Sequence, residues 1–257
     1  MYIKQLLLVS LAILFCSCGN GVDDEKSNQS TSTDATSKTQ YVEKIVTQVE
    51  NTWGLDFVST PIDQASAAEI EASKAVAYVN YREGGCATGF FISDDGLFLT
   101  NEHVLSRQRC HKGKCPNIKI IRDYKIGGAI EVYDDFEVLA HNYSLDYALA
   151  KVKLKDGEKV PFLKMEWSGA TEAKNFEGSD LKIIGHPNCS SLRTGNAIFS
   201  YGQDQNLVLR SIAISGNSGS PLFDLTTKKV VGLYHASYMD YPLSVFILVI
   251  KTTYLKS

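Results

Sequence analysis

The sequence predicts an all-β protein built from short antiparallel strands. From residue 75 onward, short apolar or alternating runs recur at regular spacing and are separated by turn-forming residues. The clearest pair, 88–92 and 97–100, flanks a Ser-Asp-Asp-Gly turn at 93–96, a composition that is typical of a hairpin. Few segments have helical periodicity. Many short strands with few helices favour a β-barrel or a β-sandwich.

The remaining strands are expected at similar intervals along the chain. These runs are 77–81, 118–121, 129–132, 136–140, 148–154, 181–184, 196–201, 207–211, 230–234 and 244–250. We expect a helix near 64–75, inside an N-terminal arm that covers 41–74, and a short helix at 252–256. The hydrophilic stretch 155–159 predicts a surface loop before the second half of the domain.

Composition and charge bound the class of protein. The chain has 257 residues, of which 44% are hydrophobic and 21% are charged, so one large or two small globular domains are expected. The net charge of −3 gives no basis for a nucleic-acid partner.

The N-terminus has the features of a targeting segment. Lys4 precedes an apolar run over 6–15 that is too short for a transmembrane helix. The following residues resemble a bacterial lipoprotein cleavage box, with Ser17 before Cys18, so we expect removal of 1–17 and lipidation of Cys18. An ordinary secretory signal is the alternative. Both predict export to the cell envelope, on the periplasmic or the outer face, and the polar stretch 18–40 predicts a disordered tether.

Four cysteines remain after the targeting segment. Cys86, Cys110, Cys115 and Cys189 are an even number in an exported chain, which predicts disulfides. Four cysteines allow three pairings, and the sequence does not choose among them. Cys110 and Cys115 are close enough to close a small loop. A metal site that combines them with His111 is the alternative, although the spacing matches no common zinc pattern.

Three side chains form a candidate catalytic set. Ser218 lies between Gly216 and Gly219, whose freedom allows backbone N–H groups to converge beside the hydroxyl. His103 follows the apolar run 97–100, and Asp146 precedes the apolar run 148–154. Hydrolysis by a hydroxyl needs a nucleophile, a base and a group that orients the base. The structural alternatives are a tight Gly/Ser turn, a surface histidine and a strand-boundary aspartate.

Asp134 and Asp135 are rivals for the acidic position, but they lie in an acidic stretch that we expect to be an exposed turn. No residue cluster suggests a metal or another cofactor, so a metal-dependent hydrolase is disfavoured. The expected reaction therefore depends on side chains alone.

Three separated motifs resemble those of chymotrypsin-like serine peptidases, most closely the bacterial glutamyl endopeptidases and Deg-type envelope proteases. The motifs are Ala-Thr-Gly-Phe-Phe-Ile at 87–92 leading to Leu-Thr-Asn-Glu-His-Val at 99–104, Asp-Tyr-Ala-Leu at 146–149, and Gly-Asn-Ser-Gly-Ser-Pro at 216–221. The resemblance implies two antiparallel β-barrels, at about 75–155 and 160–251 of a peptidase domain over 75–257, with the site between them.

The resemblance also implies the roles of the candidate residues. Ser218 would attack the scissile carbonyl, His103 would act as general base and then as acid, and Asp146 would orient the imidazole. The N–H groups of Gly216 and Ser218 would form the oxyanion hole, and proteins or peptides would be the substrates. The rival hypothesis is an inactive protease-like module that binds a partner in the cell envelope.

Two departures from the family carry further expectations. Digestive relatives have aspartate directly before the nucleophile, where it pairs with a newly cut amino terminus. Here Asn217 carries no charge, so activation by such a cut is not expected. The chain ends soon after the last expected strand, so we expect no peptide-binding PDZ module.

The resemblance places Ile212 at the floor of the primary substrate pocket, which disfavours cleavage after Lys or Arg. Glutamyl endopeptidases have a histidine where this chain has Tyr234, and His235 comes one residue later. Because side chains alternate along a strand, His235 would point away unless a bulge restores it. We expect a preference for small or medium apolar side chains, with glutamate as the alternative. His186 is expected to be structural.

Overall fold

The computed structural model describes residues 59–81, 84–106, 110–124, 130–166, 176–203, 206–211, 214–237 and 244–248. Several expected features lie outside the described residues: the targeting segment, the lipidation site Cys18, the tether, the part of the N-terminal arm before residue 59 and the helix at 252–256. None of the helices in the described part of the chain has the length and apolarity that a bilayer-spanning segment needs.

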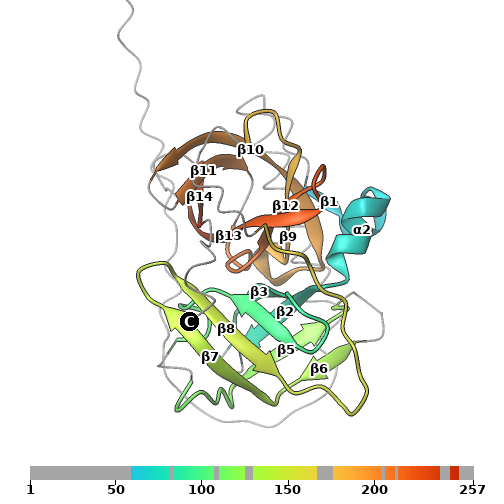
Figure 1. The fold of residues 1–257 in the computed structure, drawn as a ribbon, viewed down its shortest axis with the longest axis vertical. Coiled ribbons are helices and arrows are strands. Elements are labelled where there is room, and N and C mark those ends of the chain that lie inside the picture. The colour runs from blue at the N-terminus through green and yellow to red at the C-terminus, as the bar shows by residue number, and fades with distance from the viewer. Residues whose placement is uncertain are drawn as a thin grey trace, which may run out of the picture.

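The first of two antiparallel sheets contains the strands from residue 76 to residue 152, which form the lower half of Figure 1. Their order is β6-β5-β2-β3-β4-β8-β7. Their bounds are β2 (Val76–Tyr81), β3 (Cys86–Phe91), β4 (Leu97–Thr100), β5 (Ile118–Arg122), β6 (Glu131–Tyr133), β7 (Phe136–Asn142) and β8 (Tyr147–Val152). The hairpin expected around the 93–96 turn is present as β3 and β4, which pair directly.

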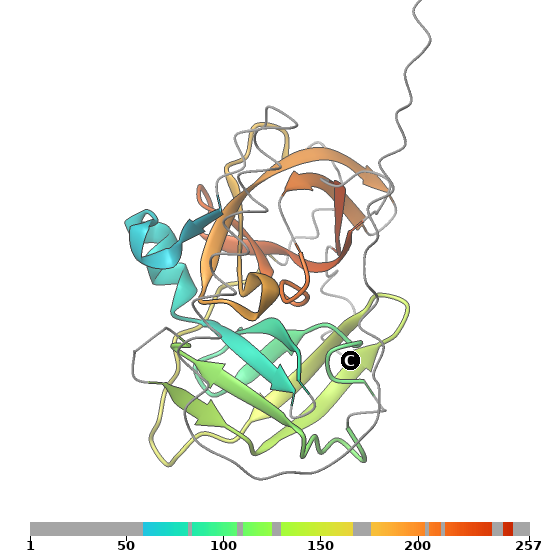
Figure 2. The same ribbon diagram turned by 180° about the vertical axis from the view of Figure 1, so that it is seen from behind.

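The second sheet has the order β1-β10-β11-β14-β13-β12-β9, and an additional pairing of β9 with β10 closes it on itself. Figure 2 shows its strongly curled strands from behind. The bounds are β1 (Ser59–Pro61), β9 (Leu181–Gly185), β10 (Arg193–Gln203), β11 (Asn206–Ser211), β12 (Pro221–Asp224), β13 (Lys229–Ser237) and β14 (Ser244–Leu248). The all-β prediction with two antiparallel barrels is therefore confirmed.

A short helical segment attaches the N-terminal side to the second barrel (Figure 1). It consists of η1 (Ile62–Gln64) and α2 (Ala67–Ser73). Ser66 and Glu69 form a capping box, which explains why the helix begins later than the expected 64–75. The other carboxylate oxygen of Glu69 accepts a 2.8 Å hydrogen bond from Thr194 of β10. This buried contact fixes α2 against the barrel.

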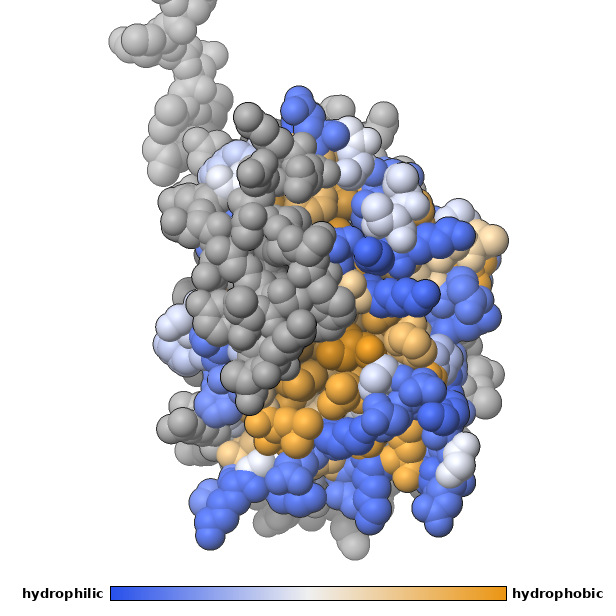
Figure 3. Space-filling model, viewed as in Figure 1, coloured by the Kyte–Doolittle hydropathy of each residue, from blue (hydrophilic) through white to orange (hydrophobic). Residues whose placement is uncertain are grey.

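Three apolar clusters form the core. One fills the first barrel and includes Phe91 and Phe98, and another fills the second barrel. The third lies between the barrels, where Phe90 and Leu99 of the first meet Leu233 of the second. On the face shown in Figure 3, apolar side chains gather near the boundary between the barrels and hydrophilic ones line the far rim of the first barrel. This packed boundary fixes the two barrels relative to each other, so that residues from both can form one site.

The structure selects one of the three disulfide pairings. Cys86 at the start of β3 is joined to Cys189 in η3 (Pro187–Cys189), so this bond links the two barrels. Cys110 and Cys115 close the small loop expected for them. Their sulfurs are therefore not available as thiolates, which contradicts the alternative of a metal site with His111. Among the described residues, no cluster of His, Cys, Asp or Glu side chains is placed to hold a metal ion.

Candidate active site

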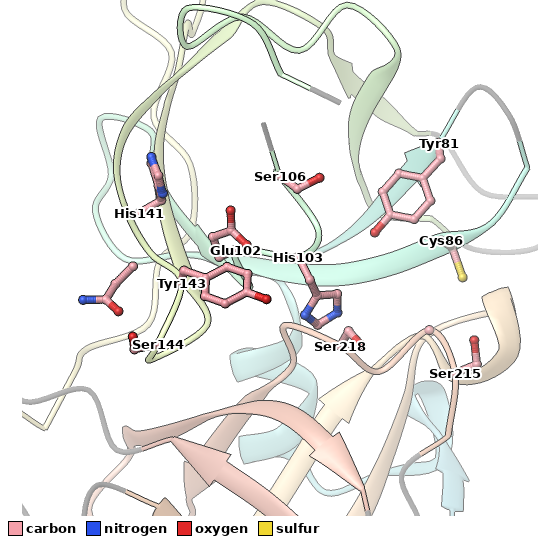
Figure 4. Close-up of a pocket in the computed structure, with 12 residues that line it drawn as sticks. Tyr81, Cys86, Glu102, His103, Ser106, His141, Tyr143, Ser144, Ser215 and Ser218 are labelled. Atoms are coloured by element: carbon pink, nitrogen blue, oxygen red, sulfur yellow. The ribbon is translucent and has the colours of Figure 1, made fainter. Parts of the chain in front are cut away.

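A cavity of about 1010 Å³ opens where the two barrels meet, and residues from both line it (Figure 4). The first barrel contributes His103, Glu102 and the residues 141–144, which cover the end of β7 and the start of its connection to β8. The second contributes Gly216 and Ser218. The structure thus brings His103 and Ser218, which are far apart in sequence, to one cavity, and Figure 4 shows the imidazole pointing toward the loop that carries Ser218.

Asp146 lies directly behind the imidazole of His103. The backbone N–H of His103 donates to Oδ1 of Asp146 at 3.0 Å, and Nδ1 lies 2.8 Å from Oδ2. Asp146 has a φ of 48°, a left-handed conformation that aspartate tolerates better than most residues. Because an ionised carboxylate can only accept, the proton is assigned to Nδ1, and this places the acceptor lone pair of His103 on Nε2, toward Ser218.

The pKa of Asp146 is consistent with this arrangement. Burial alone would raise this pKa, but the hydrogen bonds from His103 and the nearby imidazole of His235 outweigh burial and lower the pKa to about 2. A depressed carboxyl pKa stabilises the folded state above the unfolded pKa of about 3.8, and that contribution is lost as the pH falls through about 2. Asp146 is therefore ionised throughout the neutral range.

The loop that carries Ser218 is fastened to both barrels. Thr88 of β3 donates from its N–H to the carbonyl of Ser218 and from its hydroxyl to the carbonyl of Gly216, both at 2.8 Å. On the other side, the N–H of Gly219 donates to the carbonyl of Tyr234 in β13 at 2.9 Å. These bonds occupy the carbonyl groups of the loop and fix its backbone beside the cavity.

The N–H groups of Gly216 and Ser218 are not used in this fastening. Within the described part of the chain, neither N–H donates to another group, and both residues line the cavity. Gly216 adopts a φ of 93°. Two unengaged backbone donors beside a hydroxyl are what the stabilisation of an oxyanion requires.

Gly219 is the position in this loop that tolerates a side chain least. Its φ is 86°, and a Cβ there would overlap the carbonyl oxygen of Thr88 and the hydroxyl of Thr100. We expect Gly219→Ala to lower the free energy of unfolding by about 3 kcal/mol or more, since backbone strain and overlap add. Gly157 is the matched control, because its φ is 78° and nothing lies near its would-be Cβ. Urea unfolding of Gly157→Ala should show a loss of about 1 kcal/mol; equal losses in both variants would contradict the overlap.

The structure describes two of the three residues expected in the substrate pocket. Ile212 lies outside the described residues. Tyr234 is buried in the core of the second barrel. Neither Tyr234 nor His235 is among the residues that line the cavity with Ser218. A bulge in β13 falls at His235 and turns its imidazole toward Asp146, with 3.6 Å between Nδ1 and Oδ2.

Two contributions to the site were not anticipated from the sequence. Thr88 lies within the 87–92 motif, but only its contacts with the loop around Ser218 reveal its role. The segment 141–144, at the end of β7, lines the cavity although its sequence resembles any polar turn. The place of Thr88 within the 87–92 motif was the one signal that the sequence offered.

His186 occupies the structural position expected for it, at the back of the same loop. It is 1% exposed, its Nδ1–H donates to the carbonyl of Ser190 at 3.1 Å, and its ring meets Tyr78 and Tyr124 edge-on. Its backbone N–H donates to the hydroxyl of Thr88. Burial lowers the pKa of His186 to about 4.

The pKa of His186 predicts a loss of stability in acid. Below pH 6.5 the unfolded chain binds a proton that the folded chain does not bind until about pH 4. This one residue should therefore cost about 3 kcal/mol of unfolding free energy between these values. Urea unfolding at pH 7 and pH 4.5 should show a much smaller loss for His186→Phe than for the wild type. The same change at the exposed His141 should leave the wild-type loss in place.

The family model of the trypsin-like peptidase domain matches residues 87–233, more than half of the chain. A probable periplasmic serine endoprotease, DegP-like, of Rickettsia prowazekii is 30% identical over 165 residues. That match covers 59% of this chain but only 28% of the relative.

Solved structures share the fold at lower identity. The active form of the Rv3671c protease of M. tuberculosis superposes with a TM-score of 0.55 and 19% identity, over 76% of this chain and 85% of that one. The serine endoprotease of Yersinia pestis superposes with a TM-score of 0.53 and 21% identity, over 75% of this chain and 63% of that one. At these identities the likeness extends to the double-barrel architecture alone.

Proposed function

The chain belongs to the trypsin-like peptidase domain family, and from this premise we propose that it is a serine endopeptidase that acts through an acyl-enzyme on Ser218. His103 is the general base and then the general acid. Asp146 holds the Nδ1–H tautomer of His103 and balances the imidazolium. The N–H groups of Gly216 and Ser218 bind the oxyanion. No step in this reaction needs a metal or another cofactor.

One observation carries the proposal. His103, backed at 2.8 Å by an ionised Asp146, shares a cavity with Ser218 and with two unengaged backbone N–H groups. A nucleophile, a base and an orienting carboxylate, together with oxyanion donors, are the complete set for acyl transfer. A surface histidine or a structural Gly/Ser turn would not require this convergence.

The steps follow from the positions of these groups. Ser218 Oγ attacks the carbonyl carbon as its proton moves to Nε2 of His103, and the oxyanion forms beside the N–H groups of Gly216 and Ser218. Collapse breaks the C–N bond, and His103 returns the proton to the departing amine. Water then repeats the sequence on the ester, which releases the acid and regenerates the hydroxyl. Preorganised donors contribute because they need no reorientation as charge develops.

We further propose that this enzyme acts outside the cytoplasm on protein or peptide substrates. The relative from Rickettsia prowazekii is described as periplasmic. This chain has two disulfides, and its N-terminal sequence is typical of a targeting segment. Attachment to the membrane through a lipid on Cys18 is the more specific part of the proposal.

The proposed primary preference is for small or medium apolar side chains, because Ile212 offers no charged partner. A preference for glutamate needs a cation at the pocket, and His235 instead faces Asp146. Mapping cleavage sites on a denatured protein mixture tests this part. Predominant cleavage after Lys, Arg or Glu would contradict it.

A fluorophosphonate probe tests the proposed reaction directly, since it forms a stable adduct only with an activated serine. The purified wild-type chain should be labelled in a time-dependent way, and mass mapping should locate the adduct on Ser218. It should also degrade an unfolded protein. A well-folded chain that is neither labelled nor proteolytic would instead support the inactive binding module.

A further inference from the structure

We propose that His235 is a positioning residue of the site, a second imidazole that holds the carboxylate of Asp146 in place for His103. This inference rests on the proposed peptidase function and deepens it. It starts from one contact: Nδ1 of His235 lies 3.6 Å from Oδ2 of Asp146, the same oxygen that lies 2.8 Å from Nδ1 of His103. A single carboxylate oxygen is therefore flanked by two imidazoles.

A break in the regular pairing of β13 produces this contact. Tyr234 pairs with Ile247 and Ala236 pairs with Phe246, so His235 is the extra residue of a bulge between β13 and β14. A bulge changes the direction of a side chain relative to regular alternation. Here it directs an imidazole at the carboxylate of Asp146. The bulge therefore has a specific consequence, which is the contact between the His235 imidazole and Oδ2 of Asp146.

The surroundings of His235 assign its proton to Nδ1. Its Nε2 atom is buried and has no hydrogen-bond partner among the described residues. A proton on Nε2 would bury an unsatisfied donor and would leave the Nδ1 lone pair facing a carboxylate. With the proton on Nδ1, the ring presents a donor to Asp146 and only a lone pair is left unpaired. The ring thus acts as a directed N–H donor.

This placement of His235 restricts the movement of the Asp146 carboxylate. The side chain of Asp146 is 18% exposed, whereas that of His103 is 47% exposed, so the carboxylate lies in the shielded part of the pair. His235 restricts the rotation of the carboxylate that would move Oδ2 away from His103. It does so as an N–H donor while Oδ2 remains in contact with Nδ1 of His103. The 3.6 Å separation is expected to shorten when substrate is bound, as active-site contacts often do.

A pair of variants separates donation from packing. In His235→Asn the amide nitrogen occupies nearly the position of Nδ1 and preserves the donor. His235→Leu has nearly the same size as the asparagine variant but no donor. On a peptide substrate, His235→Leu should lower kcat by about 10- to 100-fold with KM within about twofold of wild type. His235→Asn should stay within about threefold of wild type in both constants.

The results of these experiments distinguish failure of the positioning role from failure of the proposed function. A wild-type kcat in His235→Leu, an equal loss in both variants, or a loss confined to KM would overturn the positioning role. An inert and unlabelled wild type would instead overturn the proposed function itself. Long-range ¹H–¹⁵N NMR of the wild-type histidines at pH 8 gives an answer even if the leucine variant does not fold. The Nδ1–H tautomer of His235 is expected, and an Nε2–H tautomer would overturn the inference.

Discussion

Replacing Ser218 with alanine should reduce kcat by about 10⁶-fold and remove labelling by a fluorophosphonate. The effect is large because the three side chains act as a unit: without the Ser218 hydroxyl, His103 has no nucleophile to activate. Some acceleration over the uncatalysed reaction should remain from the oxyanion donors. The fold should be unaffected, since the bonds that fasten this loop use the backbone of Ser218 and not its hydroxyl. Peptide turnover, adduct mass and thermal melting measure these three expectations.

Ser215 provides a matched control for this experiment. It is an exposed serine on the same loop and lines the same cavity. Its known contact is made by its carbonyl, which accepts from the N–H of Asn188, so Ser215→Ala removes a hydroxyl without disturbing the backbone. We expect turnover within about twofold of wild type. Retained labelling in Ser218→Ala, or its loss in Ser215→Ala, would assign the nucleophile to another serine.

Much of the fold was predictable because its signals are local. The 93–96 turn with apolar runs on both sides predicted a hairpin, and β3 and β4 form one. The run expected at 97–100 coincides with β4, because a short apolar run directly follows a strong turn signal there. β1 was missed, since its three residues, which end in a proline, have no periodicity of their own and pair only with β10. Pairing partners of that kind are a property of the folded chain.

The parts of the site that could not be predicted depend on contacts across the fold. The choice among disulfide pairings requires knowing that the start of β3 faces η3, which the spacing of cysteines does not contain. The direction of His235 depends on a bulge, and a shift of one residue reverses the face of a strand side chain. Catalytic candidates can therefore be recognised from their motifs, whereas the residues that contact them are known only once the strand pairing is known.

Asp146→Asn should lower kcat by about 10⁴-fold near neutral pH while leaving the backbone in place. An asparagine can present its amide N–H to Nδ1 of His103, which would then hold a lone pair and carry its proton on Nε2. A protonated Nε2 cannot accept the proton of Ser218, so the wrong tautomer is stabilised. The effect should be mainly on kcat, because no substrate contact is removed. Steady-state kinetics on a peptide substrate measure the loss.

Asp135 tests whether this loss is specific to the position behind His103. The sequence made it a rival, and the structure places it on the surface, where it pairs with Lys114 and Lys153. Exposed ion pairs contribute little to stability, so Asp135→Asn should leave kcat and KM within about twofold of wild type. A comparable loss in both variants would mean that negative charge in general is needed. A loss in Asp146→Asn alone ties the reaction to the one carboxylate that an imidazole on each side holds in place.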